Sequence, residues 1–195
     1  MTTLTTLTTL TTLTSRLRLG FASSLLAMTV AVPLQSVSAA TKAEVDSKVG
    51  FALERLHQEV PGSLEVTRKA NGVLVFPGVI KAGFIIAGEG GQGALLIGGK
   101  VVANYNIMSG SIGLQGGAEK KDIILAFMDA TSLKKFQDSN GWRVGADGSV
   151  TLINTGAAAK VDLTKNNQPI LGFVVGQSGL MAGVSLDGSK ITRAK

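Results

Sequence analysis

Glycine recurs inside the apolar runs of this chain, and this feature constrains the fold more than any other. Residues 83 to 100 read GFIIAGEGGQGALLIGGK, and 25 of the 195 residues are glycine. Glycine within a strand weakens a flat sheet but permits sharp bends and close contacts between backbones. The sequence therefore predicts a sheet that is strongly curved.

The same stretch contains the spacing Gly88-x-Gly90-x-x-Gly93, which also occurs in dinucleotide-binding loops. Such a loop needs a helix directly after its glycines and an acidic residue about 20 positions further on. Here an apolar run at 94–97 and Gly98-Gly99 follow, which predict a strand and a turn, and no carboxylate lies near position 113. We therefore expect these glycines to turn hairpins and not to bind a nucleotide.

The apolar pattern predicts a helical start followed by many short strands. Val45, Val49, Ala52, Leu53, Leu56 and Val60 share one side of a helix that ends at Pro61-Gly62. Further helices are predicted from Ser63 to Ala70 and around Ser132 to Gln137. Strands are predicted at 73–76, 79–87, 94–97, 101–108, 111–118, 123–128, 142–144, 150–153, 170–177, 180–186 and 191–193, with tight hairpin turns at Asp147-Gly148 and Asp187-Gly188.

These elements predict an α+β, β-rich fold. We expect a strongly curved antiparallel sheet or half-closed barrel, with an N-terminal amphipathic helix and a short helix in the middle. Small polar residues alternate with apolar ones in 109–118, a pattern that suits the wall of a barrel.

The first forty residues predict a leader. Residues 1–14 are a low-complexity TTL repeat, and Arg16 and Arg18 then precede an apolar stretch of about 14 residues. Ser38-Ala39-Ala40 supplies the small residues that signal peptidase requires, and the stretch is shorter than the roughly 20 residues of a membrane span. We expect a secretory signal peptide cleaved near Ala40, a periplasmic or secreted protein, and one domain from 41 to 195.

Cysteine content, net charge and aromatic residues exclude several classes of protein. The chain has no cysteine, so its stability must come from packing, and it lacks the acylated cysteine that anchors a bacterial lipoprotein. Its net charge of +6 falls to +4 when Arg16 and Arg18 are removed, a mild bias that is compatible with anionic surfaces. The few aromatic residues do not cluster with the lysines, so we expect no nucleic-acid partner.

The sequence contains no convincing arrangement of catalytic residues. His57 is the one histidine, and a solvated position on the first helix is expected for it. Ser109 and Ser111 have no histidine nearby in sequence, which makes a hydrolase the third choice of function. Glu119 and Asp122, with two lysines between them, predict a solvated charged turn and not an acid–base pair. We expect no enzyme, no metal and no cofactor.

Three ordered blocks resemble a known family. Residues 71–100 read NGVLVFPGVIKAGFIIAGEGGQGALLIGGK, 109–120 read SGSIGLQGGAEK, and 177–193 read QSGLMAGVSLDGSKITR. These resemble the SYLF domain, also called the Ysc84 actin-binding-like domain, over residues 45–193, and the chain is similar to the single-domain bacterial members. The resemblance implies phospholipid binding, with actin as a partner in yeast-type members; we do not expect actin as the partner of an exported protein.

We therefore expect an exported module that binds phospholipid or a membrane surface without catalysis. In eukaryotic members an N-terminal amphipathic helix engages membranes, and residues 45–60 occupy the matching position, although a helix that merely covers the sheet explains the same pattern. The candidate lipid-binding residues are Phe51, Arg68, Lys69, Lys81, Lys100, Lys120, Lys121, Lys134 and Lys135, whose cations we expect at turns and element ends. The alternative is a structural or interaction protein of the cell envelope that binds a protein partner or a small apolar ligand.

Overall fold

The computed structural model describes residues 41–83, 86–112, 117–153, 168–179 and 185–194. Residues 38–195 belong to one compact unit. The predicted leader and signal peptide lie outside the described residues, as does most of the strand predicted at 180–186.

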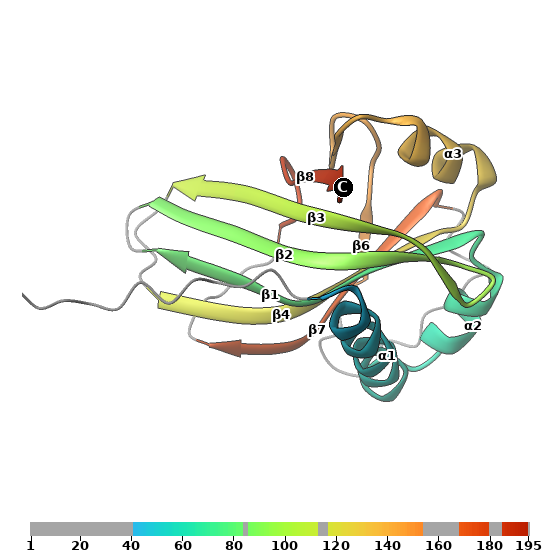
Figure 1. Cartoon of the computed structure of the whole chain (residues 1–195), viewed down its shortest axis with the longest axis horizontal. Helices are drawn as coiled ribbons and strands as arrows, with labels where there is room; N and C mark the ends of the chain where they lie inside the picture. Colours follow the sequence, from blue (N-terminus) through green and yellow to red (C-terminus); the bar gives the residue numbers. More distant parts are fainter. Residues whose placement is uncertain (1–40, 84–85, 113–116, 154–167, 180–184, 195) are drawn as a thin grey trace, which may run out of the picture. The chain divides into compact units, whose positions relative to one another are not determined.

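Eight strands form one sheet in the order β5-β8-β3-β2-β1-β4-β7-β6. All neighbouring strands are antiparallel except β6 and β7, which are parallel. Figure 1 shows β1 to β4 and β7 side by side in a sheet that curls across its width, which confirms the expected β-rich half-barrel. The strands are β1 (Gly72–Gly83), β2 (Ile86–Ile97), β3 (Lys100–Ile112), β4 (Gly117–Phe127), β5 (Trp142–Arg143), β6 (Thr151–Ile153), β7 (Ile170–Gly179) and β8 (Lys190–Arg193).

Several strand boundaries and connections differ from the predicted ones. The predicted run 73–76 and the first part of the predicted run 79–87 belong to one strand, β1, with a bulge between them at Pro77-Gly78, and the end of the second run lies in β2. The run 111–118 is divided between the end of β3 and the start of β4. The turn at Asp147-Gly148 does not join a hairpin, because β5 pairs with β8 and β6 pairs with β7.

The glycines of the opening motif lie within a strand, so the prediction that they turn hairpins was wrong. Gly88, Gly90 and Gly93 are all part of β2, which continues to Ile97 and is followed by another strand. A Cβ atom on Gly93 would overlap the Val75 carbonyl oxygen of β1. This glycine therefore permits close approach of two backbones. Since β2 leads into β3 and not into a helix, the motif lacks the helix N-terminus that holds a pyrophosphate.

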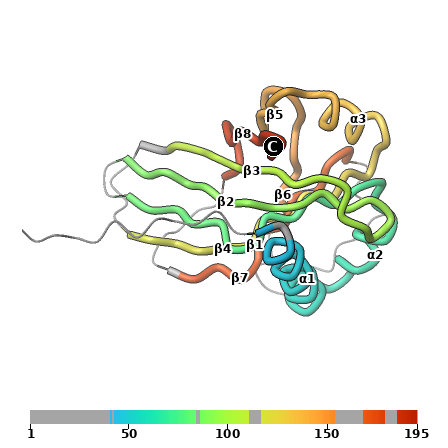
Figure 2. Tube along the Cα trace, viewed as in Figure 1, coloured from blue at the N-terminus to red at the C-terminus, as the bar shows by residue number. Residues whose placement is uncertain are grey.

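Helix α1 (Lys42–Glu59) packs on one face of the sheet, as its pattern predicted. Thr41 caps it by accepting a hydrogen bond from the Glu44 amide at 3.3 Å. Figure 2 shows α1 and α2 (Ser63–Lys69) on the same side of the strands. The buried cluster there is formed by Val45, Val49, Ala52, Leu56, Val60 and Val66 from the helices and by Val73, Val75, Ala94, Ile124, Ala126, Leu171, Phe173 and Val175 from the strands.

Helix α3 (Ala130–Asp138) packs against the opposite face. Asp129 caps it by accepting hydrogen bonds from Ser132 and Thr131, and these hydrogen bonds lower the pKa of the Asp129 carboxyl. Phe136 stacks on Tyr105 and Phe127 with ring centroids 4.9 and 5.0 Å apart. Aromatic pairs of this kind add packing energy beyond the area they bury.

A buried ion cluster lies on the α3 side of the sheet. Lys121 of β4 is 2% exposed, and its ammonium lies 3.3 Å from Glu89 and 3.7 Å from Glu119. The Gln177 side-chain amide donates to Glu119 at 2.9 Å. The expected solvated turn at 119–122 was therefore wrong: these residues belong to a strand inside the sheet, and Glu119, Lys121 and Asp122 are all buried.

Replacing Lys121 by methionine should destabilise the protein by about 3–5 kcal/mol, because Glu89 and Glu119 would remain buried without their cation. Urea denaturation followed by circular dichroism measures the change. Lys120→Met is the matched control, because Lys120 is exposed and should tolerate the same change within about 0.5 kcal/mol. Adding Glu89→Gln and Glu119→Gln to Lys121→Met should recover part of the loss; equal stability of the two single variants would contradict this account.

Alanine at Gly93 and at Gly88 should have opposite effects. Gly93→Ala should cost about 1–3 kcal/mol, because the new methyl group overlaps the Val75 carbonyl. Gly88→Ala meets nothing within 4 Å and should be neutral or stabilising by up to about 1 kcal/mol. Thermal denaturation of both variants distinguishes them, and similar melting temperatures would show that β2 does not need its glycine at 93.

Candidate functional site

Helix α1 is tied to the sheet by a carboxylate at the β1 bulge. Asp122 of β4 is buried, and one of its oxygens lies 2.5 Å from the Arg55 guanidinium of α1. Its other oxygen accepts a hydrogen bond from the Gly78 amide at 2.7 Å. Three elements therefore meet at one carboxylate.

A pocket of about 300 Å³ opens beside this carboxylate. Gly78 has a φ of +63°, a left-handed conformation that favours glycine at the bulge. The pocket is lined by Lys48, Phe51, Ala52, Arg55, Pro77, Gly78, Ile80, Lys120 and Asp122. Apolar and cationic side chains thus share one hollow.

Large apolar side chains are exposed at this pocket and farther along the same face of the sheet. Phe51 is 65% exposed on α1, and Ile80, Ile86 and Met108 are 55%, 72% and 67% exposed on the sheet. Ile80 pairs with Gly90 and Gly90 with Met108, so Ile80 and Met108 share one row and one face, about 10 Å apart. We call these four residues the outer apolar surface. The side chains of Ile80, Ile86 and Met108 lie on the α1 side of the sheet, beyond the part of it that the helix covers.

The charges of the pocket are mostly compensated. Lys48 pairs with Glu44 at 2.6 Å, and Arg55 pairs with Asp122. Lys120 is exposed and has no acidic partner among the residues that the structure describes. The pocket therefore contributes about one uncompensated positive charge to a largely apolar surface.

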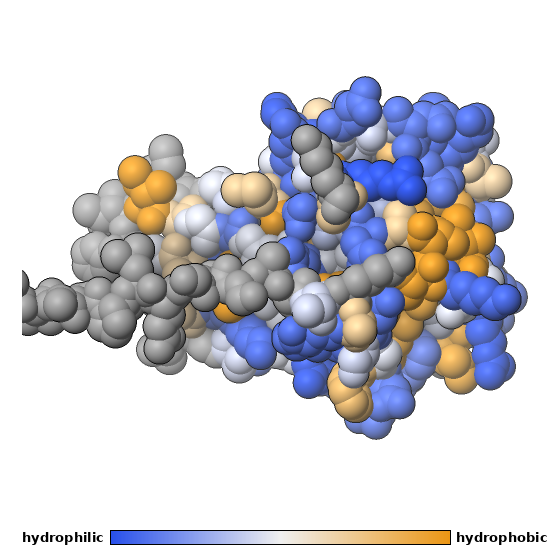
Figure 3. Space-filling model, viewed as in Figure 1, coloured by the Kyte–Doolittle hydropathy of each residue, from blue (hydrophilic) through white to orange (hydrophobic). Residues whose placement is uncertain are grey.

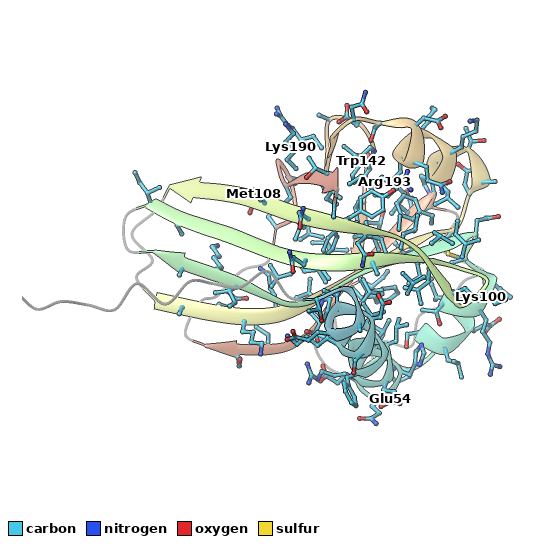
Figure 4. The ribbon with its side chains drawn as sticks, viewed as in Figure 1. Glu54, Lys100, Met108, Trp142, Lys190 and Arg193 are labelled. Carbon is cyan, nitrogen blue, oxygen red and sulfur yellow. The ribbon has the colours of Figure 1, made fainter. Side chains whose placement is uncertain are left out.

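The structure does not bring the predicted cations together. Lys120 lines the pocket with Phe51, whereas Arg68 lies on α2 near Gly98 and Gly99, at the end of the sheet where Figure 4 shows Lys100. Lys69 is exposed on α2 and pairs with Glu65; Lys134 and Lys135 are exposed on α3, and Lys134 pairs with Asp138. Lys81 is half-buried on the opposite face, in register with Glu89 and Glu119. Lys121 is buried, so its predicted position at an exposed turn was wrong.

The catalytic candidates are separated by the sheet. Glu119 and Asp122 are three residues apart in β4, so their side chains point to opposite faces and have different cationic partners. Ser109 is in register with Glu89 on the α3 side, whereas His57 belongs to α1 on the other side. Ser109 and His57 are therefore not a nucleophile and its base.

Two further observations concern only the residues that the structure describes. None of their helices is long and apolar enough to cross a membrane. Their histidine, aspartate and glutamate side chains form no group of three or more that could hold a metal ion.

His57 is not the solvated residue that the sequence suggested. It is half-buried against α2, and its Nε2 lies 3.1 Å from Thr67 Oγ1. Since the Thr67 hydroxyl donates to the Leu64 carbonyl at 3.1 Å, its oxygen is left to accept from His57. Burial, and then the positive charge of Arg68, lower the pKa of His57. The imidazole is therefore neutral at pH 7.

Comparisons with known proteins agree with the resemblance seen in the sequence. Residues 108–195 match the family Ysc84, described as "Las17-binding protein actin regulator". The chain is 29% identical over 137 residues to "SH3 domain-containing YSC84-like protein 1" of Xenopus laevis, an alignment that covers 67% of this chain. It spans 40% of the length of that relative. The resemblance to this family is confirmed.

Protonation of His57 should weaken the fold. Its pKa is lower in the folded chain than the unfolded value of about 6.5, so the unfolded chain binds more protons and stability falls as pH drops through that value. We expect the free energy of unfolding, measured with urea, to fall between about pH 7.5 and about pH 5.5. In His57→Gln, whose amide can still donate to Thr67, this part of the decrease should disappear; an unchanged pH dependence would contradict it.

Proposed function

From the match of residues 108–195 to the Ysc84 (SYLF) family, we propose that the chain is an exported, non-catalytic module that binds phospholipid at a membrane surface. Export rests on the leader pattern of residues 1–40. The absence of a catalytic role rests on the separation of Ser109 from His57 and of Glu119 from Asp122.

One observation carries the lipid proposal. Phe51 and Ile80, both more than half exposed, line the same pocket as Lys120. Exposed apolar side chains beside a lysine are what an interfacial surface needs, because the apolar groups enter the acyl boundary while the ammonium meets a lipid phosphate. Met108 and Ile86 extend the same surface along the sheet.

Approximate free energies indicate whether apolar or charged contacts dominate the binding to a membrane. Burying a phenylalanine side chain contributes about 1.5–3 kcal/mol, and each of the other apolar side chains contributes a similar amount. A lysine near an anionic membrane contributes about 1 kcal/mol. Since the pocket offers about one uncompensated cation, apolar contacts should supply most of the affinity, and its dependence on salt should be modest.

The printed descriptions of the family and of the Xenopus relative suggest actin regulation as a second activity. Those descriptions concern other proteins, and a leader that directs export would place this chain away from actin. The outer apolar surface therefore favours a membrane as the partner.

Sedimentation with vesicles tests the proposal. The full chain should bind vesicles of phosphatidylcholine with phosphatidylglycerol, and binding should fall only a few-fold when salt is raised from about 0.05 to 0.5 M. Phe51→Ser should weaken binding by about ten- to one-hundredfold, because an apolar anchor of ~1.5–3 kcal/mol is lost. Lys120→Gln should weaken it about fivefold, and only at low salt.

Two matched variants control for general effects. Val102→Ser changes an apolar residue that is 47% exposed outside the outer apolar surface, and Lys135→Gln removes one exposed charge from α3. Both should bind as the unmodified chain does. Absence of binding to every vesicle composition would reject the membrane proposal and favour a protein partner in the cell envelope.

A further inference from the structure

A second pocket of about 360 Å³ lies between α1, α2 and the turn that joins β2 to β3. Its walls are mainly apolar, with Leu53 from α1, Leu64 from α2, Ala70 just after α2, and Val73 and Leu96 from the sheet. Figure 3 shows hydrophobic side chains gathered at this end of the protein, over the ends of β2 and β3 beside α2. Pockets of a few hundred cubic ångströms with apolar walls are typical of small-molecule sites.

The polar side chains of this pocket are cationic or neutral. Arg68 lines it and is exposed, and His57 and Thr67 contribute a neutral imidazole and a hydroxyl that are bonded to each other. No aspartate or glutamate is among the lining residues. The single charge of the pocket is therefore positive, and it lies on a side chain that can reach both solvent and the apolar walls.

From these features we propose that the second pocket binds the alkyl chain of a fatty acid, whose carboxylate pairs with Arg68. The apolar walls match a hydrocarbon chain, and the guanidinium matches a carboxylate in geometry as well as in charge. The limited volume favours one chain over the two chains of a phospholipid. This site is distinct from the outer apolar surface, and the proposal does not depend on membrane binding.

His57 provides a direct probe, because it is the one histidine of the chain and its ring lines the pocket. Its ring C–H signals in a ¹H–¹³C NMR spectrum should shift on addition of decanoate and saturate at one ligand per chain. Affinity should increase about fourfold per methylene from hexanoate to decanoate, as burial of each added CH₂ predicts.

Three variants separate head-group from chain recognition. Arg68→Gln should weaken decanoate binding about tenfold but leave the binding of 1-decanol unchanged, whereas Lys69→Gln, which removes the same charge from a residue that does not line the pocket, should change neither. Ala70→Phe should abolish binding by filling the pocket, and a folded state is checked by circular dichroism. Decyltrimethylammonium should bind more weakly than decanoate.

Three results would overturn the proposal that the second pocket binds a fatty acid. His57 signals that do not respond to decanoate, equal binding of decanoate and decyltrimethylammonium, or equal effects of Arg68→Gln and Lys69→Gln would each overturn the proposal. If Ala70→Phe does not fold, the pair of charge variants still tests it. Retained vesicle binding by Arg68→Gln would show that the two sites are independent.

Discussion

The contact on which the rest of the structure depends is the one that Asp122 makes with α1 and β1. Its carboxylate binds Arg55 on one side and accepts from the Gly78 amide on the other, so one buried group fixes both the position of the helix and the bulge of the strand. A charge-assisted hydrogen bond to a backbone amide is directional, and it holds the bulge where an ordinary ladder is interrupted. The bulge in turn brings Ile80 to the helix side of the sheet, where it lines the same pocket as Phe51.

Alternation along β4 gives two neighbouring lysines opposite roles. Lys120 points to the α1 side and is exposed, whereas Lys121 points to the α3 side and neutralises two buried carboxylates. A one-residue slip of this strand would place a lysine among the apolar residues under α1 and leave Glu89 without its cation. The buried cluster thereby helps to fix the register of the sheet, which fold-specifying charges can do.

The sequence predicted most helices and strands correctly, but it did not predict which strands each turn connects. The amphipathic pattern of 45–60 identified α1 and its buried side correctly, because a helix that covers a sheet leaves a clear 3.6-residue period. Gly88, Gly90 and Gly93 looked like turn residues, since local propensity does not reveal that the β1 backbone passes close to Gly93.

The charged residues were harder to place. Lys121 was expected at a surface because lysine is rarely buried, and its partner Glu89 is 32 residues away in sequence, on a strand that is not adjacent to β4. The sequence named Phe51 and Lys120 among nine lipid-binding candidates without placing them together, and it assigned Asp122 to a solvated turn. The packing of α1 on the sheet, together with the pairing of β1 with β4, brings these residues together.

The two ends of the strand order are β5 and β6, of two and three residues, whereas the strands between β3 and β4 are ten residues or longer. A long, glycine-rich and partly apolar border would invite another chain to extend the ladder. The short terminal strands cover only part of the long strands beside them, because β8 pairs with residues 105–108 of β3 and β6 pairs with residues 171–173 of β7. Among the described residues, 109–112 of β3 and 174–179 of β7 therefore pair with no strand on their outer side, and these are the segments at which another chain could extend the sheet.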